Sequence, residues 1–573
     1  MIYPDYKEVF EDGKESENLE FFLKDIPTIK VIRIISFISA CLDFKIADFE
    51  IQNFILKELL RNLNRRDQLY ISQKINSVSD RPKIVFHHVA CLLILQSSIL
   101  NFKSGNNTKL LPGDTRNILR AFLHCNTKYS NVMENFIPKL VESEDVNIKL
   151  GLVITMDIAQ KFFNPEKDIF EQSYKLKEFD EFLKNDKEIG GDYYIEFLIS
   201  KNIDNFLDII KRIWNIYFKI FRTEKVFDYE KLITTIKVEN NDNLIENYFS
   251  SFSIQVGNIT HYKEKFIESD LDFKLIRNYP VFKLTENLFA VLNSNFLVDR
   301  IFHSLLFEYF NFIQQNGYSK NFRDFKSYYS EVFVEKFLLK RIIDFIFEKT
   351  KLDIKQPGDI MKIKDKHNKD YSDYYIRKGY KILLFECKDR IMKAETKYSY
   401  DFNKIREDLN EKFIKVGVDQ LIEVIHSIKN REFRFDKLDG KDLEKLTILP
   451  IIVYTDPTYC VRGLNYIINN IFIEKLNQDI LNFQVRNLIM IHIDTLINYQ
   501  DLFHDKKVDL LNVFERYNKF IEKAKLKLVK GKNSSINDFL DFDSFLRIYL
   551  VKERKTIYSD KGYVKKIYKD LYT

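Results

Sequence analysis

Cysteine is scarce in this 573-residue chain, and its spacing argues against the usual cysteine-based scaffolds. The cysteines are odd in number and no two of them form a C-x-x-C pair; they are Cys41, Cys91, Cys125, Cys387 and Cys460. This pattern argues against a disulfide framework and against a zinc ribbon. We therefore expect the protein to fold in a reducing compartment, the cytoplasm.

Long apolar runs and nucleotide-binding loops are also lacking. No apolar stretch approaches the roughly 18 residues that a membrane-spanning helix needs, and the first residues, MIYPDYKEVFEDGKESE, are charged rather than signal-like. A Walker A loop is missing, because Gly531-Lys532 is followed by Asn533 and no glycine stands five residues before Gly531. We expect a protein that binds no membrane and hydrolyses no nucleotide triphosphate by itself.

A strong charge of one sign is absent as well. The net charge is +6, from 90 basic and 84 acidic residues spread along the chain, so any surface for a polyanion has to be local. One local candidate is the C-terminal segment, where four tyrosines between Tyr558 and Tyr572 alternate with basic residues. Such a segment is typical of an arm that tracks a nucleic-acid backbone, but also of a solvated helical face.

What the chain does contain is a hairpin pattern, SDYYIRKGYKILLFECK, from Ser372 to Lys388. Its second run is apolar and ends in Glu386-Cys387-Lys388. Because a strand alternates its faces at every residue, Glu386 and Lys388 share one face and Cys387 lies on the other. The end of the predicted strand therefore presents an acid and an amine together.

The turn of this hairpin decides where Asp373 lies. A two-residue loop at Gly379-Tyr380, with glycine first as a type II′ turn requires, places Asp373 opposite Glu386. A loop at Lys378-Gly379 places it opposite Leu384, on the same face as Glu386 and one diagonal step away. Both registers bring two carboxylates and one ammonium together, which is a site for Mg²⁺, or Mn²⁺ in its place, that could polarise a phosphoryl oxygen.

The arrangement resembles the PD-(D/E)xK nuclease superfamily, whose fold is restriction-endonuclease-like, over roughly residues 321–501. Ser372-Asp373 stands where the family has Pro-Asp, and Glu386-Cys387-Lys388 matches the E-x-K half. The resemblance implies Asp373 and Glu386 as metal ligands and Lys388 as the residue that positions and activates water.

The resemblance also implies two further site residues. Such families often carry another acid on the helix before the sheet; we prefer Glu335 as this metal ligand, with Glu331 in reserve, because Glu335 follows an apolar residue within helical apolar spacing. Gln420 matches a polar residue that relatives place on the helix after the site. The tyrosine that some relatives carry four positions later is absent, since Val424 stands there.

Other polar clusters carry weaker signals. Asp359, after Pro357-Gly358, is the rival to Asp373, but the hairpin does not pair it with Glu386. His87-His88 and Cys91 have helical ligand spacing, yet a zinc site would need further ligands, and His124-Cys125 offers no comparable spacing. We favour a buried core histidine and an inert cysteine there.

The pattern of elements predicts a multidomain α plus α/β protein, since one core rarely exceeds about 300 residues. We expect a helical domain over 1–165, a second helical region over 166–320 that ends in a hairpin around Thr285-Glu286-Asn287, a nuclease-like domain over 321–507 and a helical, basic segment over 508–573. The nuclease-like domain should contain a helix over 327–347, a strand around 352–364, the hairpin, a helical stretch broken near Gly417, and then alternating strands and helices in a mixed sheet covered on both faces.

These features together favour a metal-dependent endonuclease acting on nucleic acid, with DNA as the preferred substrate. By analogy with its family, it would be a restriction-like or phage-defence effector, regulated through its helical N-terminal half by a protein partner or by homodimerisation. Two alternatives stay open: an RNA nuclease of the same fold, and a catalytically silent binding or scaffold protein.

Overall fold

The computed structural model describes most of the chain. The described residues are 3–14, 17–44, 49–79, 82–105, 109–134, 145–165, 167–211, 214, 235–238, 243–267, 271–364, 371–433, 435–436, 438, 443–477, 481–529, 536–553, and 562, 564, 565, 567 and 569. They form two compact units. Unit 1 comprises residues 1–142, 201–204 and 208–301, and unit 2 comprises residues 143–200, 205–207 and 302–573.

Unit 1 contains a helical part in which α3 packs on α6, and α2 packs on both α6 and α7. Its N-terminal helices are α1 (Tyr6–Val9), α2 (Leu19–Leu23), α3 (Thr28–Phe44), α4 (Phe49–Leu60), α5 (Arg65–Ser77), α6 (His88–Leu100) and α7 (Pro112–Glu134). The later helices are α13 (Asn243–Ser251), α14 (Ile259–Lys265), α15 (Lys274–Asn278) and α16 (Ser294–Asp299). The helical character predicted for the N-terminal part is confirmed.

A small sheet accompanies these helices. Its strands are β1 (Thr235–Lys237), β2 (Ser253–Ile254), β3 (Val281–Thr285) and β4 (Leu288–Val291), in the order β1-β4-β3-β2. The predicted hairpin around Thr285-Glu286-Asn287 is β3-β4. Two further strands extend the sheet on either side of this hairpin, since β1 pairs with β4 and β2 pairs with β3. The sequence did not predict these strands, because two or three residues are too few to show an alternating pattern.

Unit 2 includes three helices from the N-terminal half of the chain: α9 (Val146–Phe163), α10 (Ile169–Asn185) and most of α11 (Asp192–Lys201). This division differs from the boundaries expected at 165, 320 and 507, for a physical reason. The ring of Phe179 on α10 lies edge-on to Phe333, at 5.0 Å between centroids, and α9 contacts α21 and α22, the helices that follow the predicted hairpin. These contacts join α9 and α10 to the unit that contains the hairpin.

The centre of unit 2 is a mixed six-stranded sheet in the order β10-β8-β7-β6-β5, with β9 paired to β8. The strands are β5 (Ile354–Pro357), β6 (Tyr374–Lys378), β7 (Lys381–Lys388), β8 (Thr447–Tyr454), β9 (Gln484–Val485) and β10 (Ile489–His492). Pairing is antiparallel among β5, β6 and β7 and parallel among β7, β8 and β10. Nearly every residue of β7 and β8 is buried, as continuous apolar runs in a covered sheet require.

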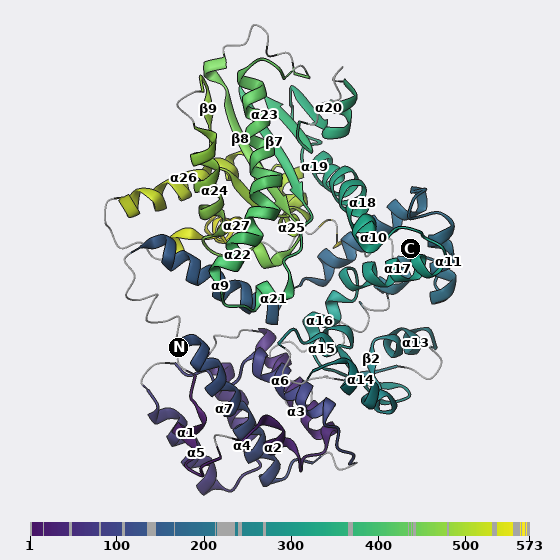
Figure 1. Cartoon of the computed structure of the whole chain (residues 1–573), viewed down its shortest axis with the longest axis vertical. Helices are drawn as coiled ribbons and strands as arrows, with labels where there is room; N and C mark the ends of the chain where they lie inside the picture. The colour runs from purple at the N-terminus through teal and green to yellow at the C-terminus, as the bar shows by residue number, and fades with distance from the viewer. Residues whose placement is uncertain are drawn as a thin grey trace. The chain divides into compact units, whose positions relative to one another are not determined.

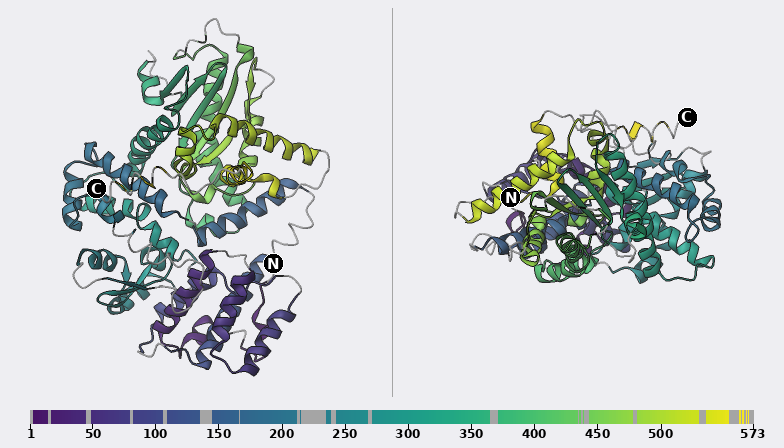
Figure 2. Two further views of the ribbon diagram at one scale, coloured as in Figure 1. Left: turned by 180° about the vertical axis from the view of Figure 1, so that it is seen from behind. Right: turned by 90° about the horizontal axis from the view of Figure 1, so that it is seen from above.

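Helices cover this sheet. Before the hairpin come α17 (His303–Gln315), α18 (Phe322–Tyr328), the π-helix η2 (Tyr329–Leu339), α19 (Lys340–Ile346) and α20 (Gly358–Lys364); after it come α21 (Ala394–Lys397), α22 (Phe402–Leu409), the π-helix η3 (Asn410–Val418), α23 (Asp419–Lys429), α24 (Leu464–Leu476), α25 (Ile493–His504), α26 (Leu510–Val529) and α27 (Phe542–Lys552). Figure 1 shows α22 and α23 in front of β7 and β8. From behind, α26 and α27 come to the front (Figure 2, left).

Two local expectations for unit 2 are corrected. The strand expected around 352–364 ends at Pro357, and Gly358 begins helix α20. The helix expected to break near Gly417 continues through η3 into α23. A Cβ at position 417 would lie 3.2 Å from Ile452 and 3.6 Å from Cε of Lys388, so glycine serves close packing on the sheet there and not a turn. The mixed α plus α/β class is confirmed.

Among the described residues, no helix is both long and apolar enough to cross a membrane.

Candidate active site

The hairpin of β6 and β7 has the first of the two expected registers. Lys378 pairs with Lys381, so the loop is Gly379-Tyr380, and Gly379 has a φ of +61°. A glycine accepts this left-handed conformation without steric cost. The loop is also held by Asp353, whose Oδ2 accepts a hydrogen bond from the Gly379 N–H at 2.7 Å. The turn therefore fixes which residues meet at the other end of the hairpin.

At that other end, Asp373, Glu386 and Lys388 lie together. Nζ of Lys388 donates to Oε1 of Glu386 at 2.7 Å, and both residues are buried, with exposures of 8% and 3%. Oδ2 of Asp373 accepts from the backbone N–H of Cys387, at 2.6 Å, between the other two residues. The carboxylate of Asp373 and the ion pair of Glu386 and Lys388 thus form one cluster at the end of β7, as both registers predicted.

Close backbone packing places Asp373 at this position. The N–H of Gly358 donates to the carbonyl of Asp373 at 2.9 Å, and a Cβ on Gly358 would lie 2.4 Å from the carbonyl oxygen of Ser372. Position 358 therefore requires glycine. The next residue, Asp359, lies in the first turn of α20, where its carboxylate accepts from the N–H of Ile360. Asp373, and not Asp359, bonds to the strand that carries Glu386.

The π-helix η2 brings Glu335 to the same cluster. Burial raises the pKa of Glu335 to about 9, and the negative charges of Asp373, Glu386 and Asp389 add to this effect. The positive charge of Lys388 opposes it only in part. A metal-free carboxyl group in this position is therefore neutral at pH 7. Its alternative, Glu331, is exposed and pairs with Lys336, so the structure brings Glu335 and not Glu331 to the site.

Lys388 keeps its charge inside this cluster. Burial alone lowers the pKa of a lysine, but the carboxyl groups of Glu386, Asp373 and Glu335 outweigh it and raise the pKa of Lys388 above its ordinary value. Lys388 is thus an ammonium that contacts the carboxylate of Glu386 directly and interacts electrostatically with the carboxyl groups of Asp373 and Glu335.

Asp389 is a functional candidate that the sequence prediction missed. It follows Lys388 directly, is 8% exposed, and accepts hydrogen bonds from Lys326, Ser330 and Thr455. Although burial raises its pKa, the charge of Lys326 and these hydrogen bonds lower it, with a net lowering. The sequence signal was present but weak: an aspartate directly after E-x-K, and a lysine and a serine four residues apart on a helix.

Gln420 lies on α23 and is exposed. The residue of this helical stretch that packs on the site is Gly417, three positions earlier, against the aliphatic part of Lys388. A role for Gln420 stays a prediction.

The carboxyl groups of the site suit a hard divalent cation by their chemistry. Three carboxyls converge, and burial together with the charges of the other acids raises the pKa of Glu335, so that it carries a proton that a cation would replace. Their oxygens do not all lie within 4.8 Å of one another. Binding one ion through Glu335, Asp373 and Glu386 therefore requires side-chain rotation.

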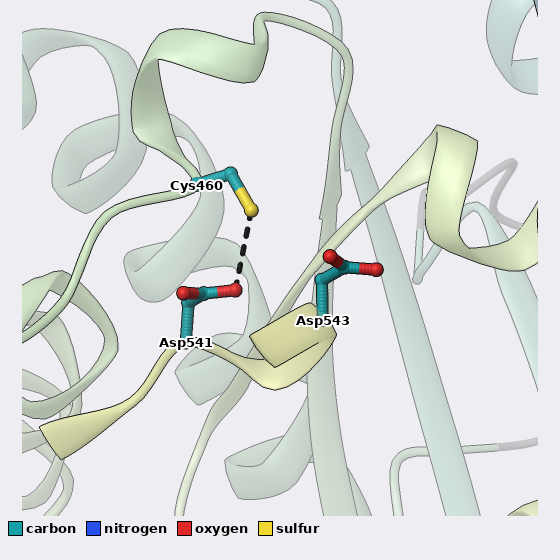
Figure 3. Close-up of side chains that lie close together, drawn as sticks. All are labelled: Cys460, Asp541 and Asp543. Carbon is teal, nitrogen blue, oxygen red and sulfur yellow. Dashed lines mark hydrogen bonds between the residues drawn. The ribbon is translucent and has the colours of Figure 1, made fainter. Parts of the chain in front are cut away.

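Within the described part of the chain, the only three metal-ligating residues with atoms all within 4.8 Å are Cys460, Asp541 and Asp543 (Figure 3). Protein donors already use these carboxylates. Asp541 caps α27, accepting from the backbone N–H and the hydroxyl of Ser544 and from Sγ of Cys460 at 3.2 Å. Asp543 pairs with Arg547 one turn later, at 2.9 Å. A helix cap and an ion pair thus account for this group.

The histidine pair of α6 is a core feature, as the sequence favoured. Nδ1 of His87 accepts from the N–H of Ala90 at the start of α6, and Nε2 lies 3.0 Å from Oδ1 of Asn126. Burial lowers the pKa to about 4 for His87 and to about 3 for His88. Both nitrogens of His87 are thus used by the protein. The tyrosines of the C-terminal arm, at 558, 563, 568 and 572, lie outside the described residues.

Comparisons with known proteins add no relationship. No protein-family model, no curated protein and no solved structure matches the chain.

Proposed function

We propose that unit 2 is a metal-dependent phosphodiesterase of the restriction-endonuclease-like fold that cleaves nucleic acid, with DNA as the preferred substrate. The observation that carries the proposal is the meeting of Asp373, Glu386 and Lys388 at one end of a hairpin, with Glu335 added from a separate helix. An isolated E-x-K would be common in a chain that is 30% charged. A third acid from a helix some 40 residues upstream, whose pKa is raised by burial and by the charges of the other two, is not expected of an ordinary solvated hairpin.

The order of the strands also supports this fold. An antiparallel hairpin lies beside two parallel strands, and helices cover the sheet. The proposed ligands on the hairpin lie where β6 begins and β7 ends, at one end of the strands of a buried sheet. Residues at the ends of strands can contact a large substrate while the sheet holds them in place.

In this proposal, Asp373, Glu386 and Glu335 hold Mg²⁺ or Mn²⁺. When bound, the cation supplies polarisation of a phosphoryl oxygen and a water of lowered pKa. Glu335 would release its proton to solvent when it served as a ligand. With Glu386 also a ligand, the ammonium of Lys388 would be free to orient the attacking water and to offset the negative charge that develops on the phosphate.

A cleavage assay tests the proposal. The full-length protein and the variants Glu386→Ala, Lys388→Ala and Glu331→Gln are incubated in Mn²⁺ with supercoiled DNA, single-stranded DNA and total RNA. We expect cleavage of DNA by the wild type and by Glu331→Gln, whose changed side chain lies outside the cluster, and loss of at least 100-fold in the other two variants, roughly the loss typical of a removed transition-state contact.

The other outcomes decide between the alternatives. Cleavage of RNA alone would assign the same site to RNA. Absence of cleavage by the wild type, or equal cleavage by all four proteins, would contradict the proposal and leave the binding or scaffold protein.

A further inference from the structure

Asp389 joins three separate segments of unit 2. Its Oδ2 accepts from Nζ of Lys326, on α18, and from Oγ of Ser330, on η2, at 2.8 Å. Its Oδ1 accepts from Oγ1 of Thr455, just after β8. Since Asp389 itself follows β7, its one carboxylate ties the helix that carries Glu335 to the ends of two neighbouring strands.

The spacing of the residues on this helix explains why the tie bears on Glu335. Ser330 follows Lys326 by four positions, and Glu335 follows Ser330 by five. In an α-helix, residues five apart point about 140° away from each other. In the π-helix η2, whose hydrogen bonds join residues five apart, the turn is wider, so the fifth residue lies nearer to that face than it would in an α-helix. The π-form therefore brings Glu335 nearer to the face that Asp389 holds, and the charge of Asp389 acts on the carboxyl group of Glu335.

Asp389 makes strong contacts with this unusual helix. The carboxylate is buried, and its bond with Lys326 is an ion pair in which the side chains of Lys326 and Asp389 are 19% and 5% exposed. Hydrogen bonds between charged groups that are shielded from water are among the stronger ones in proteins. Long π-helical stretches are rare and persist only where the surroundings determine them. The Ser330 contact is the weaker tie, because its one proton is shared with the carbonyl of Lys326.

We propose that Asp389 is a positioning residue, which holds the π-helical turn of η2 and thereby keeps Glu335 directed at the metal site formed with Asp373 and Glu386. This inference rests on the proposed function. It predicts that the loss of Asp389 weakens metal binding through Glu335 alone, without contact between Asp389 and the metal.

A double-mutant cycle on Mn²⁺ binding to the full-length protein tests the inference. Mn²⁺ affinity is measured by electron paramagnetic resonance for the wild type, Asp389→Asn, Glu335→Gln and the double variant, well below their unfolding temperatures. We expect Asp389→Asn to raise Kd about 10-fold, the effect typical of residues that orient metal ligands. In the Glu335→Gln background the same change should leave Kd unaltered, because the residue through which it acts is gone.

Two further variants complete the design. Asp408→Asn is the matched control, since Asp408 also accepts from a lysine and a hydroxyl, Lys412 and Tyr459, but on α22 and outside the cluster. Its Kd should equal that of the wild type. Ser330→Ala is the substitute should Asp389→Asn fail to fold. It removes only the weaker hydrogen bond to Asp389, so we expect a smaller rise in Kd. In the Glu335→Gln background this rise should again be absent.

The outcomes separate the inference from the function on which it rests. If the wild type binds no Mn²⁺, the proposed function fails. If the wild type binds Mn²⁺, but the Asp389→Asn or Ser330→Ala change leaves Kd unaltered or raises it equally in both backgrounds, only the positioning role is overturned. A purely structural role would lower the unfolding temperature without this dependence on Glu335.

Discussion

Replacing Glu335 by Gln should stabilise the metal-free protein. The pKa of this carboxyl is raised from 4.5 to about 9 by burial and by the neighbouring acids. An acid with a raised pKa in the folded state binds more protons there than in the unfolded chain, so stability falls as the pH rises from about 4.5 to about 9. Glutamine has the same shape and no proton to lose, and it removes this dependence.

The magnitude follows from the size of the shift. Each pKa unit corresponds to about 1.4 kcal/mol. Glu335→Gln should therefore raise the unfolding free energy by about 1 kcal/mol at pH 5.5 and by about 2–5 kcal/mol at pH 8. The larger value applies if the folded protein does not rearrange around the ionised carboxylate. Glu331→Gln, on the exposed side of the same helix, should change stability by less than about 0.5 kcal/mol at either pH.

Hydrogen exchange at the amides of β7 is a suitable assay, because it reports the stability of unit 2 alone. Addition of Mg²⁺ should stabilise the wild type by more than it stabilises Glu335→Gln, since a bound ligand stabilises in proportion to its affinity. A variant that is less stable than the wild type at pH 8, or a gain that does not grow with pH, would refute the account of a neutral carboxyl crowded among acids.

Three other changes test separate parts of the structure. Gly358→Ala should displace the backbone of Asp373 and reduce cleavage at least 10-fold. Gly113→Ala is the control and should leave cleavage unchanged, because open space surrounds Gly113. Equal activity of both variants in a cleavage assay would contradict the role of Gly358. Phe179→Ala should lower the unfolding free energy of unit 2 by about 3–5 kcal/mol in urea titrations, and no loss would contradict the assignment of α10 to that unit. Lys388→Met should lower stability by about 3–5 kcal/mol, because it removes the ammonium that offsets the buried negative charge of Glu386. Thermal unfolding should show Mg²⁺ restoring part of this loss, and equal stability with and without Lys388 would contradict the ion pair.

The centre of the fold could be predicted because its signals are local. Gly379 permits the tight loop, and alternation then determines the faces of Glu386 and Lys388. The runs that form β8 and β10 are apolar enough to indicate buried strands, in keeping with the alternation of strands and helices expected after the hairpin. The preference for Glu335 over Glu331 rests on the resemblance, in which an apolar residue precedes the acid, and the charges of Asp373 and Glu386 act on Glu335 in the structure.

Other features depend on contacts between distant residues. Asp389 gains its three partners from segments that are 59 to 66 residues away in the sequence, so its place directly after E-x-K is only a weak local signal and does not reveal these contacts. The π-helical form of η2 and η3 likewise has no sequence signature comparable to a cap or a turn. Glycine is a poor helix former, so Gly417 predicts a helix break, but tight packing against Ile452 and Lys388 overrides that preference.

The most direct test of the proposed metal site is anomalous diffraction from crystals of the full-length protein soaked in Mn²⁺. The account predicts a manganese peak between the carboxylates of Asp373 and Glu386, with Glu335 turned towards it and Lys388 released from Glu386. No peak at this position, or a peak only at Cys460, Asp541 and Asp543, would contradict it.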